Sequence, residues 1–315
     1  MKKILLLVFV LLLGVAAAYF YFGPNPVKLV DNPQIEGAAT VVKRPIMRIG
    51  LVSDSHNDNE ILKKALAQAQ GIGVNFVIGL GDWSDLGTEE ELTAANKTFN
   101  DSKLKTFLLP GDRDLWDSRN RGEEALLNYQ DIFGRTVQTF EQKGVQFVLV
   151  DNSDIYKGIS PEGWKSLEEA LAKDAKLHLV FAHKTPFHPD SSHVMGEDSP
   201  EVAKQAENLI NLMQRTHPCH SGDERSEDTR IDSGYTGPCG SCEPKARMTS
   251  ALCPAVDGFF SGDLHFFAKF KSPDASVKIT TIGAVDADRN FQGPRFGVLT
   301  IFDDYSWEVE DVEIR

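Results

Sequence analysis

Short apolar runs rich in β-branched and aromatic residues alternate with amphipathic, helix-like stretches from residue 47 to the C terminus. This alternation is typical of α/β folds, in which strands and helices follow one another along the chain. Strands are predicted at residues 48–52, 76–80, 105–109, 145–150, 177–181, 258–260, 277–282, 296–302 and 307–312. Helices are predicted at residues 61–70, 161–173 and 201–213. The pattern therefore predicts an α/β domain over residues 47–315.

Acidic residues and histidines follow several of the predicted strands directly. In chain order they are Asp54, His56, Asp82, Asp112, His183, Asp263 and His265. Ligands of layered α/β folds gather at the carboxyl ends of strands, so we expect these side chains to lie close together. Carboxylates and imidazoles are common ligands of divalent metal ions. A metal site at this edge of the fold is the resulting prediction, although Asp112 and Asp263 would also suit ordinary turns after a strand.

The order of these short motifs resembles the calcineurin-like metallophosphoesterase superfamily, whose pattern is D-x-H, G-D, G-N-H-[DE], H and G-H-x-H. The resemblance covers the chain from about residue 47 to its end, and three of the five motifs fit directly. It implies a four-layer αββα sandwich of two mixed sheets flanked by helices. It also implies a metal-dependent phosphohydrolase that cleaves a phosphate ester or anhydride.

The same resemblance implies a role for each site residue. Asp54, His56 and His265 would bind one metal ion; Asp112, His183 and Asp263 would bind a second. Asp82 would bridge the two ions and so take part in catalysis. Paired divalent ions lower the pKa of a shared water molecule, so that hydroxide is available near pH 7 to attack phosphorus.

Two of the motifs depart from the family pattern. Residues 111–114 read G-D-R-D, with Asp112 in place of the family's Asn and Arg113 in place of its His. Residues 262–265 read G-D-L-H, with Asp263 in place of the first His. The two acidic replacements add negative charge, which we expect the catalytic candidate Arg113 to offset. Carboxylate in place of imidazole favours Mn, or Fe and Mg, over Zn as the two divalent ions.

Arg113 also suggests an alternative function. Arginine stays protonated in proteins and cannot act as a general acid for the leaving group. The chain could then be a catalytically silent member of the same fold that binds metal or phosphate. Asp85 and Asp114 are interpreted as helix caps or as groups that support the ligands, and His188 and His193 as loop residues.

The N terminus suggests export. Lys2 and Lys3 precede a mostly apolar run at residues 4–22, long enough for one membrane-spanning helix of a cell-membrane protein whose catalytic domain lies outside the cytoplasm. Alternatively, the segment is a signal peptide cleaved at Ala16, Ala17 and Ala18, and the protein is secreted. We expect residues 1–22 to be this anchor or signal peptide and residues 23–46, which contain four prolines, to be a linker.

Residues 191–254 are predicted to be a polar insertion whose first half contains the helix at 201–213. Its second half has few aliphatic residues and cannot bury much apolar surface. The chain's four cysteines lie at or near this insertion: Cys219, Cys239, Cys242 and Cys253. Export favours disulfides, while a dispensable insertion and a zinc site remain alternatives.

The charge of the chain limits its partners. With 33 Lys and Arg against 46 Asp and Glu, the formal net charge is −13. Proteins that bind nucleic acid rely on clustered Lys and Arg, so no nucleic-acid partner is expected. A small phosphorylated substrate, such as a nucleotide, diphosphate or diester, is compatible with this charge when metal ions supply positive charge locally. The lipid bilayer is the other expected partner, through residues 4–22.

Overall fold

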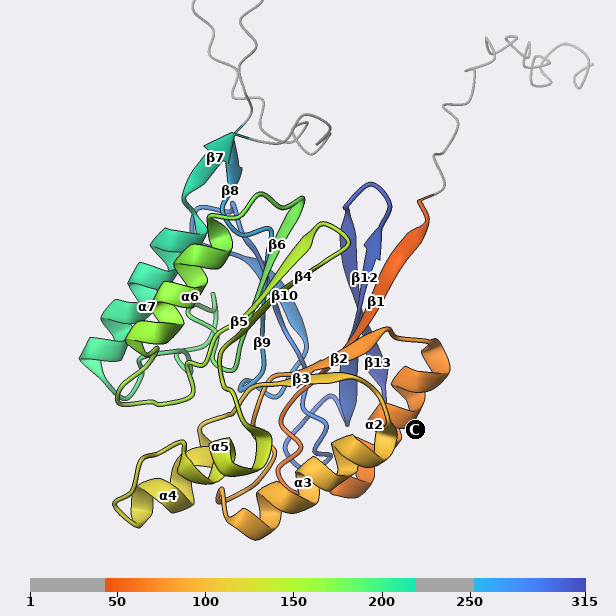
Figure 1. Ribbon diagram of the computed structural model, residues 1–315, viewed down its shortest axis with the longest axis vertical. Helices are drawn as coiled ribbons and strands as arrows, with labels where there is room; N and C mark the ends of the chain where they lie inside the picture. Colours follow the sequence, from red (N-terminus) through yellow and green to blue (C-terminus); the bar gives the residue numbers. More distant parts are fainter. Residues whose placement is uncertain (1–42, 219–251) are drawn as a thin grey trace, which may run out of the picture. The chain divides into compact units, whose positions relative to one another are not determined.

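Two mixed β-sheets packed face to face organise the part of the chain that the structure describes (Figure 1). The structure is a computed structural model and describes residues 43–218 and 252–315. The predicted anchor or signal peptide at residues 4–22 lies outside this range, as do residues 23–42 of the predicted linker and Cys219, Cys239 and Cys242. Among the described residues, no helix has the length and apolar character needed to cross a membrane.

One sheet has five strands and joins the two ends of the folded region. In spatial order its strands are β13 (Trp307–Glu313), β12 (Arg295–Phe302), β1 (Pro45–Val52), β2 (Phe76–Gly79) and β3 (Thr106–Leu108). β1, β2 and β3 are parallel, whereas β12 is antiparallel to both β1 and β13. Because β1 begins at Pro45, the last two residues of the predicted linker belong to the sheet instead.

The second sheet has six strands. In spatial order they are β10 (Ala268–Lys271), β11 (Lys278–Thr281), β9 (Gly258–Ser261), β6 (Leu177–Ala182), β5 (Val145–Leu149) and β4 (Gln138–Gln142). The four central strands are parallel and the two outer ones antiparallel to their neighbours. A small antiparallel pair, β7 (Thr216–Pro218) and β8 (Leu252–Pro254), lies apart from both sheets in the topology.

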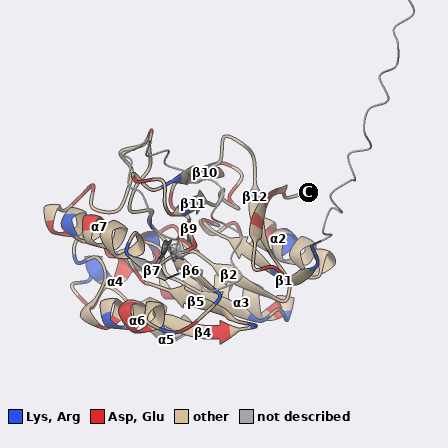
Figure 2. Ribbon diagram, turned by 90° about the horizontal axis from the view of Figure 1, so that it is seen from above, with Lys and Arg blue, Asp and Glu red and all other residues tan. Residues whose placement is uncertain are grey.

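Helices cover the outer faces of the two sheets (Figures 1 and 2). The α-helices are α2 (Asn59–Ile72), α3 (Glu89–Ser102), α4 (Trp116–Asn120), α5 (Leu127–Phe133), α6 (Pro161–Leu171) and α7 (Pro200–Met213), and a short 3₁₀ helix, η1, spans Arg113–Leu115. In the view of Figure 2, α7 and α2 lie at opposite sides of the molecule. The predicted arrangement of two mixed sheets flanked by helices is confirmed.

Alternation along the strands explains the layers. On β6, Leu177, Leu179 and Phe181 belong to the apolar cluster between the sheets, whereas Val180 and Ala182 belong to the cluster under the helices. Successive side chains of a strand point to opposite faces, so a strand covered on both faces is mostly apolar. β6 is buried along its whole length and apolar at every position except His178, and this pattern predicts a strand.

The helix predicted at residues 201–213 is present as α7. Its residues Val202, Ala206, Leu209 and Met213 are buried in the cluster that covers the six-stranded sheet. The side chain of Ser199 accepts a hydrogen bond from the backbone N–H of Val202 and so caps its first turn. Residues 200–213 of the predicted insertion thus contribute to the hydrophobic core through this helix.

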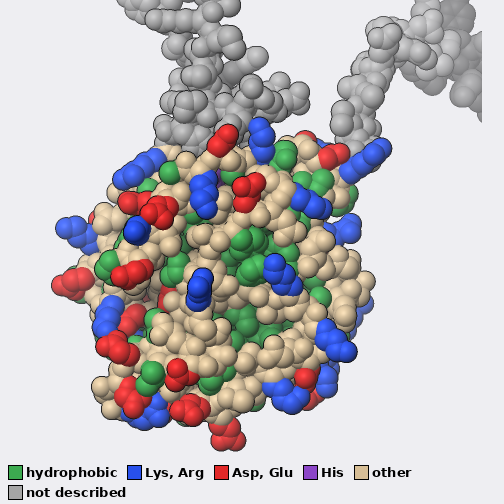
Figure 3. Space-filling view, viewed as in Figure 1, with side chains coloured by type: hydrophobic (Ala, Val, Ile, Leu, Met, Phe, Trp, Pro, Cys, Tyr) green, Lys and Arg blue, Asp and Glu red, His purple; other side chains and the backbone are tan. Residues whose placement is uncertain are grey.

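Acidic and basic side chains are intermixed on the face of the molecule shown in Figure 3, with apolar areas between them. The interior is different. Asp54, Asp82, Asp114 and Asp263 are buried, each with at most 5% of its surface exposed. Burying a charge is costly unless it is paired, hydrogen-bonded or bound to a metal, so the contacts of these carboxylates indicate where function resides.

Candidate metal centre

The C-terminal ends of five parallel strands bring the predicted ligands together. Asp54 and His56 follow β1, Asp82 follows β2, Asp112 follows β3, His183 follows β6, and Asp263 and His265 follow β9. Backbone hydrogen bonds tie these loops to one another, including His56 N–H to Asp82 O (3.0 Å) and Gly262 N–H to His183 O (2.9 Å). The site is therefore built where both sheets end, as expected for layered α/β folds.

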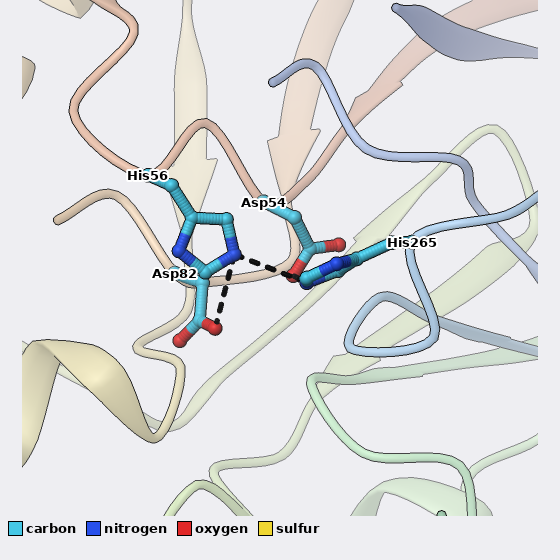
Figure 4. A group of neighbouring side chains, drawn as sticks. All are labelled: Asp54, His56, Asp82 and His265. Carbon is cyan, nitrogen blue, oxygen red and sulfur yellow. Dashed lines mark hydrogen bonds and ion pairs between the residues drawn. The ribbon is translucent and has the colours of Figure 1, made fainter. Parts of the chain in front are cut away.

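Four residues form the first group of potential ligands. One donor atom from each of Asp54, His56, Asp82 and His265 lies within 4.8 Å of the others. Figure 4 shows the two imidazole rings turned towards each other, with their Nε2 atoms 3.0 Å apart. His56 Nε2 is 3.6 Å from Asp82 Oδ2, and His265 Nε2 is 3.8 Å from Asp54 Oδ1.

Asp82, Asp112 and His183 form the second group, again with donor atoms within 4.8 Å of one another. His183 Nδ1 lies 2.7 Å from the carbonyl oxygen of Leu80, to which it donates. This bond leaves Nε2 directed at Asp112 Oδ1 (3.3 Å) and Asp82 Oδ1 (3.6 Å). A backbone acceptor behind the ring is the usual way to orient a metal-binding histidine.

Asp82 is common to both groups and divides its two oxygens between them. Oδ2 faces His56 of the first group, whereas Oδ1 faces His183 of the second. The backbone N–H of Arg113 also donates to Oδ1, at 3.0 Å. This arrangement is the one that a carboxylate shared by two cations requires.

Asp263 differs from the other predicted ligands. It is not part of either group, and its Oδ1 is 2.7 Å from the ammonium nitrogen of Lys184. His193 Nε2 lies 3.3 Å from the same oxygen, and His193 Nδ1 is 2.5 Å from Glu197 Oε1. The cation in contact with the extra carboxylates is therefore Lys184, which the sequence analysis missed, and not Arg113.

Lys184 is almost inaccessible to solvent, with 3% of its side chain exposed. Its Nζ is also 3.8 Å from Asp112 Oδ1. One signal for it is present in the sequence: this lysine directly follows a predicted ligand at the end of a strand that is apolar except for His178. Its partner Asp263 is 79 residues away, which sequence patterns do not reveal.

Arg113 lies at the edge of the second group. Its guanidinium carbon is 4.0 Å from the centre of the Trp116 ring, a cation–π contact. The described residues thus place Arg113 beside the site, with its backbone bound to Asp82 and its side chain stacked on an aromatic ring.

The pKa values of the buried carboxylates differ between the two halves of the centre: those of Asp54 and Asp82 are raised, and that of Asp263 is lowered. Burial raises the pKa of Asp54, and it raises that of Asp82 well above the ordinary value although His183 is near. In contrast, the pKa of Asp263 is lowered: burial raises it, but the charges and hydrogen bonds of Lys184, His193 and His183 together outweigh burial. Burial, followed by His265, lowers the pKa of His56 to about 2. The first group thus contains a neutral His56 imidazole, and among the described residues the ion-pair partners of Asp54 and Asp82 are histidines and not lysine or arginine.

This first group fits a divalent metal ion. Two imidazole nitrogens that face each other at 3.0 Å cannot both donate, but a cation about 2.1 Å from each would satisfy both lone pairs. The same ion would offset the buried charges of Asp54 and Asp82. The second group offers two carboxylates and one oriented imidazole, so its donor set also suits a cation, although Lys184 lies beside it.

The backbone at the site is strained. Asp54, His56, Asp82, Asp263 and His265 all have positive φ, between 41° and 66°. Such conformations are uncommon outside glycine, cost roughly 1–3 kcal/mol each, and cluster at functional sites. They turn successive side chains of short loops towards the same point.

Two glycines allow the loops to approach closely. A Cβ on Gly111 would lie 2.0 Å from Asp82 Oδ1, and a Cβ on Gly262 would lie 1.9 Å from Ser53 Oγ. Neither distance is sterically allowed. The Gly-Asp pairs of the sequence are therefore needed for packing between loops, in addition to supplying the carboxylates.

Asp114 supports the ligands from behind. Its Oδ1 accepts hydrogen bonds from the backbone N–H groups of Trp83 and Ser84 and from Ser84 Oγ, and its Oδ2 accepts one from Gly111 N–H. Burial nevertheless raises its pKa to about 6. This carboxyl holds the loops after β2 and β3 together. Asp85 pairs with Arg289 at 2.6 Å and approaches His56 Nδ1 at 3.6 Å.

Comparisons with known proteins agree with this geometry. Residues 47–184 match the family model described as the calcineurin-like phosphoesterase superfamily domain. Among solved structures, a dimetal phosphatase from Danio rerio is similar, with 11% identity, coverage of 86% of this chain and 100% of that one, and a TM-score of 0.54. A purple acid phosphatase from yellow lupin (Lupinus luteus) seeds has 13% identity, coverage of 85% and 51%, and a TM-score of 0.55. No curated protein sequence matches the chain.

Proposed function

The chain carries a calcineurin-like phosphoesterase superfamily domain, and we propose that it is a metal-dependent phosphohydrolase acting on a small phosphate ester or anhydride. The observation that carries this proposal is the position of Asp82, which offers one oxygen to each of two ligand groups. Two of the similar folds are a dimetal phosphatase and a purple acid phosphatase, which supports the same class of reaction.

Bound divalent ions would supply Lewis acidity, lowering the pKa of water towards 7 and offsetting the charge of the phosphate. The protein's own part is to hold the donors. Asp54, His56, Asp82 and His265 would hold one ion, and Asp82, Asp112 and His183 a second. Four of these side chains are buried, whereas Asp112 and His265 are partly exposed. The exclusion of bulk water from the buried part strengthens its electrostatic interactions.

Arg113 is the residue that we propose for contact with the substrate. Its backbone N–H fixes Asp82 Oδ1, and its side chain extends over Trp116 at the edge of the site. As a permanent cation it would stabilise negative charge on the leaving oxygen without donating a proton. This role suits leaving groups that need no proton, such as phosphate or an aryl oxide.

The carboxylate-rich donor set supports Mn, or Fe and Mg, in preference to Zn. Harder cations prefer oxygen ligands, and the second group offers two carboxylates, Asp82 and Asp112, against one imidazole, His183. Titration of the chelator-treated protein with each metal, read by activity, tests this preference.

We further propose that the domain works outside the cytoplasm, anchored by residues 4–22. Support comes from the two lysines before the apolar run and from the length of that run. Reporter fusions at residue 46 that are active only in the cytoplasm would contradict it, and N-terminal sequencing of the mature protein would reveal cleavage after Ala16, Ala17 or Ala18.

Hydrolysis of nitrophenyl phosphate and bis(nitrophenyl) phosphate with added Mn²⁺ tests the enzymatic proposal. We expect release of nitrophenol by the full chain and none by Asp82→Ala. If the full chain binds Mn²⁺ but releases no nitrophenol from either ester, and also none from a panel of nucleotides and diphosphates, the proposal fails. The chain would then be a binding module of the same fold.

A further inference from the structure

The two ligand groups differ in one respect that metal-binding patterns do not describe: a buried ammonium lies against only one of them. We infer that the resting centre binds a single divalent cation tightly, at Asp54, His56, Asp82 and His265, and that Lys184 supplies the positive charge of the other half. The inference rests on the proposed function and specifies how many ions its site holds.

Lys184 is held by the carboxylates that would otherwise complete the second site. Its Nζ is 2.7 Å from Asp263 Oδ1, 3.8 Å from Asp112 Oδ1 and 3.9 Å from Glu197 Oε1. The Asp263 oxygen that receives Lys184 also has His193 Nε2 at 3.3 Å. Asp263 Oδ1 is therefore shared by Lys184, His193 and, at 3.6 Å, His183 Nε2. Asp263 nevertheless lies outside the group formed by Asp82, Asp112 and His183.

The position of Lys184 is fixed by its backbone. Asn152 Oδ1 accepts hydrogen bonds from the N–H groups of both His183 and Lys184, at 3.1 and 3.0 Å, and Asn152 Nδ2 donates to Lys184 O at 2.7 Å. Asn152 is itself 1% exposed. The buried side-chain amide of Asn152 thus fixes the backbone of both His183 and Lys184. We regard Asn152 as a positioning residue.

A second divalent ion would compete with this ammonium. It would have to bind Asp112 and His183 while Lys184 lies within 4 Å of the same Asp112 oxygen. The ion and the ammonium would then both lie against one Asp112 oxygen, and two positive charges so close together repel strongly where water is excluded. Moving the lysine away instead would leave Asp263 buried without its closest partner, which is also costly. Both routes weaken the second site relative to the first.

The first group has no such competitor among its described contacts. The groups that approach its two imidazoles are carboxylates and each other, at 3.0–3.8 Å. An ion bound there would relieve the buried negative charge. The ammonium of Lys184 would then lie near a bound phosphate as a fixed cation. It would offset the negative charge of the phosphate, as the second ion does in a two-metal site.

The test is the metal stoichiometry of the full chain. Mn²⁺ is titrated into chelator-treated protein by calorimetry, and electron paramagnetic resonance distinguishes an isolated Mn²⁺ from a coupled pair. We expect one tight site, a second site at least about a hundredfold weaker, and the signal of an isolated ion at one equivalent. Two sites with affinities within about tenfold of each other, or a coupled-pair signal at one to two equivalents, would overturn the inference.

Substitution of the lysine provides the second arm. Lys184→Met removes the charge and keeps the length of the side chain, so the second site should tighten at least about tenfold and a coupled pair should form. The matched control is Lys204→Met on the exposed face of α7, which should behave as the unsubstituted chain. An unchanged second affinity in folded Lys184→Met contradicts the inference. The titration of the unsubstituted chain remains decisive if the variant does not fold.

The metal titration and the activity assay can fail separately. A single tight ion in a protein that hydrolyses no phosphate ester would support the inference and end the proposed function. Two equal ions in an active phosphohydrolase would do the opposite.

Discussion

The two halves of the centre are built by the same kind of loop but carry different charges. In the first half, His56 and His265 face two buried carboxylates, Asp82 and Asp54, which are paired with no lysine or arginine side chain among the described residues. In the second half, Asp263 is paired with Lys184, so the carboxylates are already partly neutralised. The comparison teaches that the fold fixes where donors lie, whereas single residues decide whether a donor is free to bind an ion.

The largest effect is expected where the halves meet. Asp82→Ala removes an oxygen from both groups, so hydrolysis of nitrophenyl phosphate should fall by about a thousandfold or more. The exposed Asp101→Ala on α3 is the control and should keep full activity. If Asp82→Ala keeps activity within tenfold of the unsubstituted chain, Asp82 is not needed for catalysis and does not connect the two ligand groups functionally.

A pair of substitutions compares the halves directly. His265→Ala should weaken the tight Mn²⁺ site by about 10- to 100-fold or more, since it removes a nitrogen donor from the first group. Asp112→Ala should change that affinity by less than about threefold. Calorimetric titration of both folded variants measures the difference. Equal losses would mean that the halves are not distinct in metal binding.

Arg113→Ala should lower turnover by about tenfold or more, because it removes the permanent cation proposed to stabilise the leaving oxygen while keeping the backbone N–H that donates to Asp82. Tight metal binding should be unaffected, since Arg113 supplies no donor to either group. Arg119→Ala, which loses contacts with Asp154 and Tyr156, is the control. Unchanged turnover on every substrate tried would show that Arg113 does not act on the phosphate.

The smallest effect is expected from making the second half more like the family pattern. Asp112→Asn combined with Asp263→His removes two carboxylates, so the preference should shift by about tenfold towards Zn²⁺ and activity on phosphate monoesters should rise. Competition between Zn²⁺ and Mn²⁺, followed by metal analysis, measures the shift. A metal profile identical to that of the unsubstituted chain would disprove the link between these two residues and metal choice.

The sequence predicted the strands best where both faces of a strand are covered. β6 and β5 are buried throughout and apolar at all but one position each, His178 and Gln146, because each contributes to two layers of core. The helix α3 was missed because only Leu92, Ala95 and Phe99 of its 14 residues are buried. Its capping box, with Thr88 and Glu91, was the available signal. The strands β4 and β10, which have no fully buried residue, were missed for the same reason.

The positions of the site residues could be predicted, but their pairing could not. Strand ends and Gly-Asp motifs led to every residue of the two groups, because the parallel strands carry them to one edge. The pair of Lys184 and Asp263 depends on a contact between loops 79 residues apart. No local pattern encodes that contact, so the compensating charge was assigned to the neighbouring residue Arg113 instead.

The left-handed backbone of five site residues also limits which amino acids can replace them. Asp, Asn and His adopt positive φ several times more often than other residues with side chains, whereas β-branched residues hardly do so. Asp54, His56, Asp82, Asp263 and His265 all belong to this small set. The loops therefore favour Asp, Asn and His as metal-binding residues and disfavour Glu. An exchange of His for Asp, as at position 263, is one of the few changes that can alter the charge of the centre without rebuilding its loops.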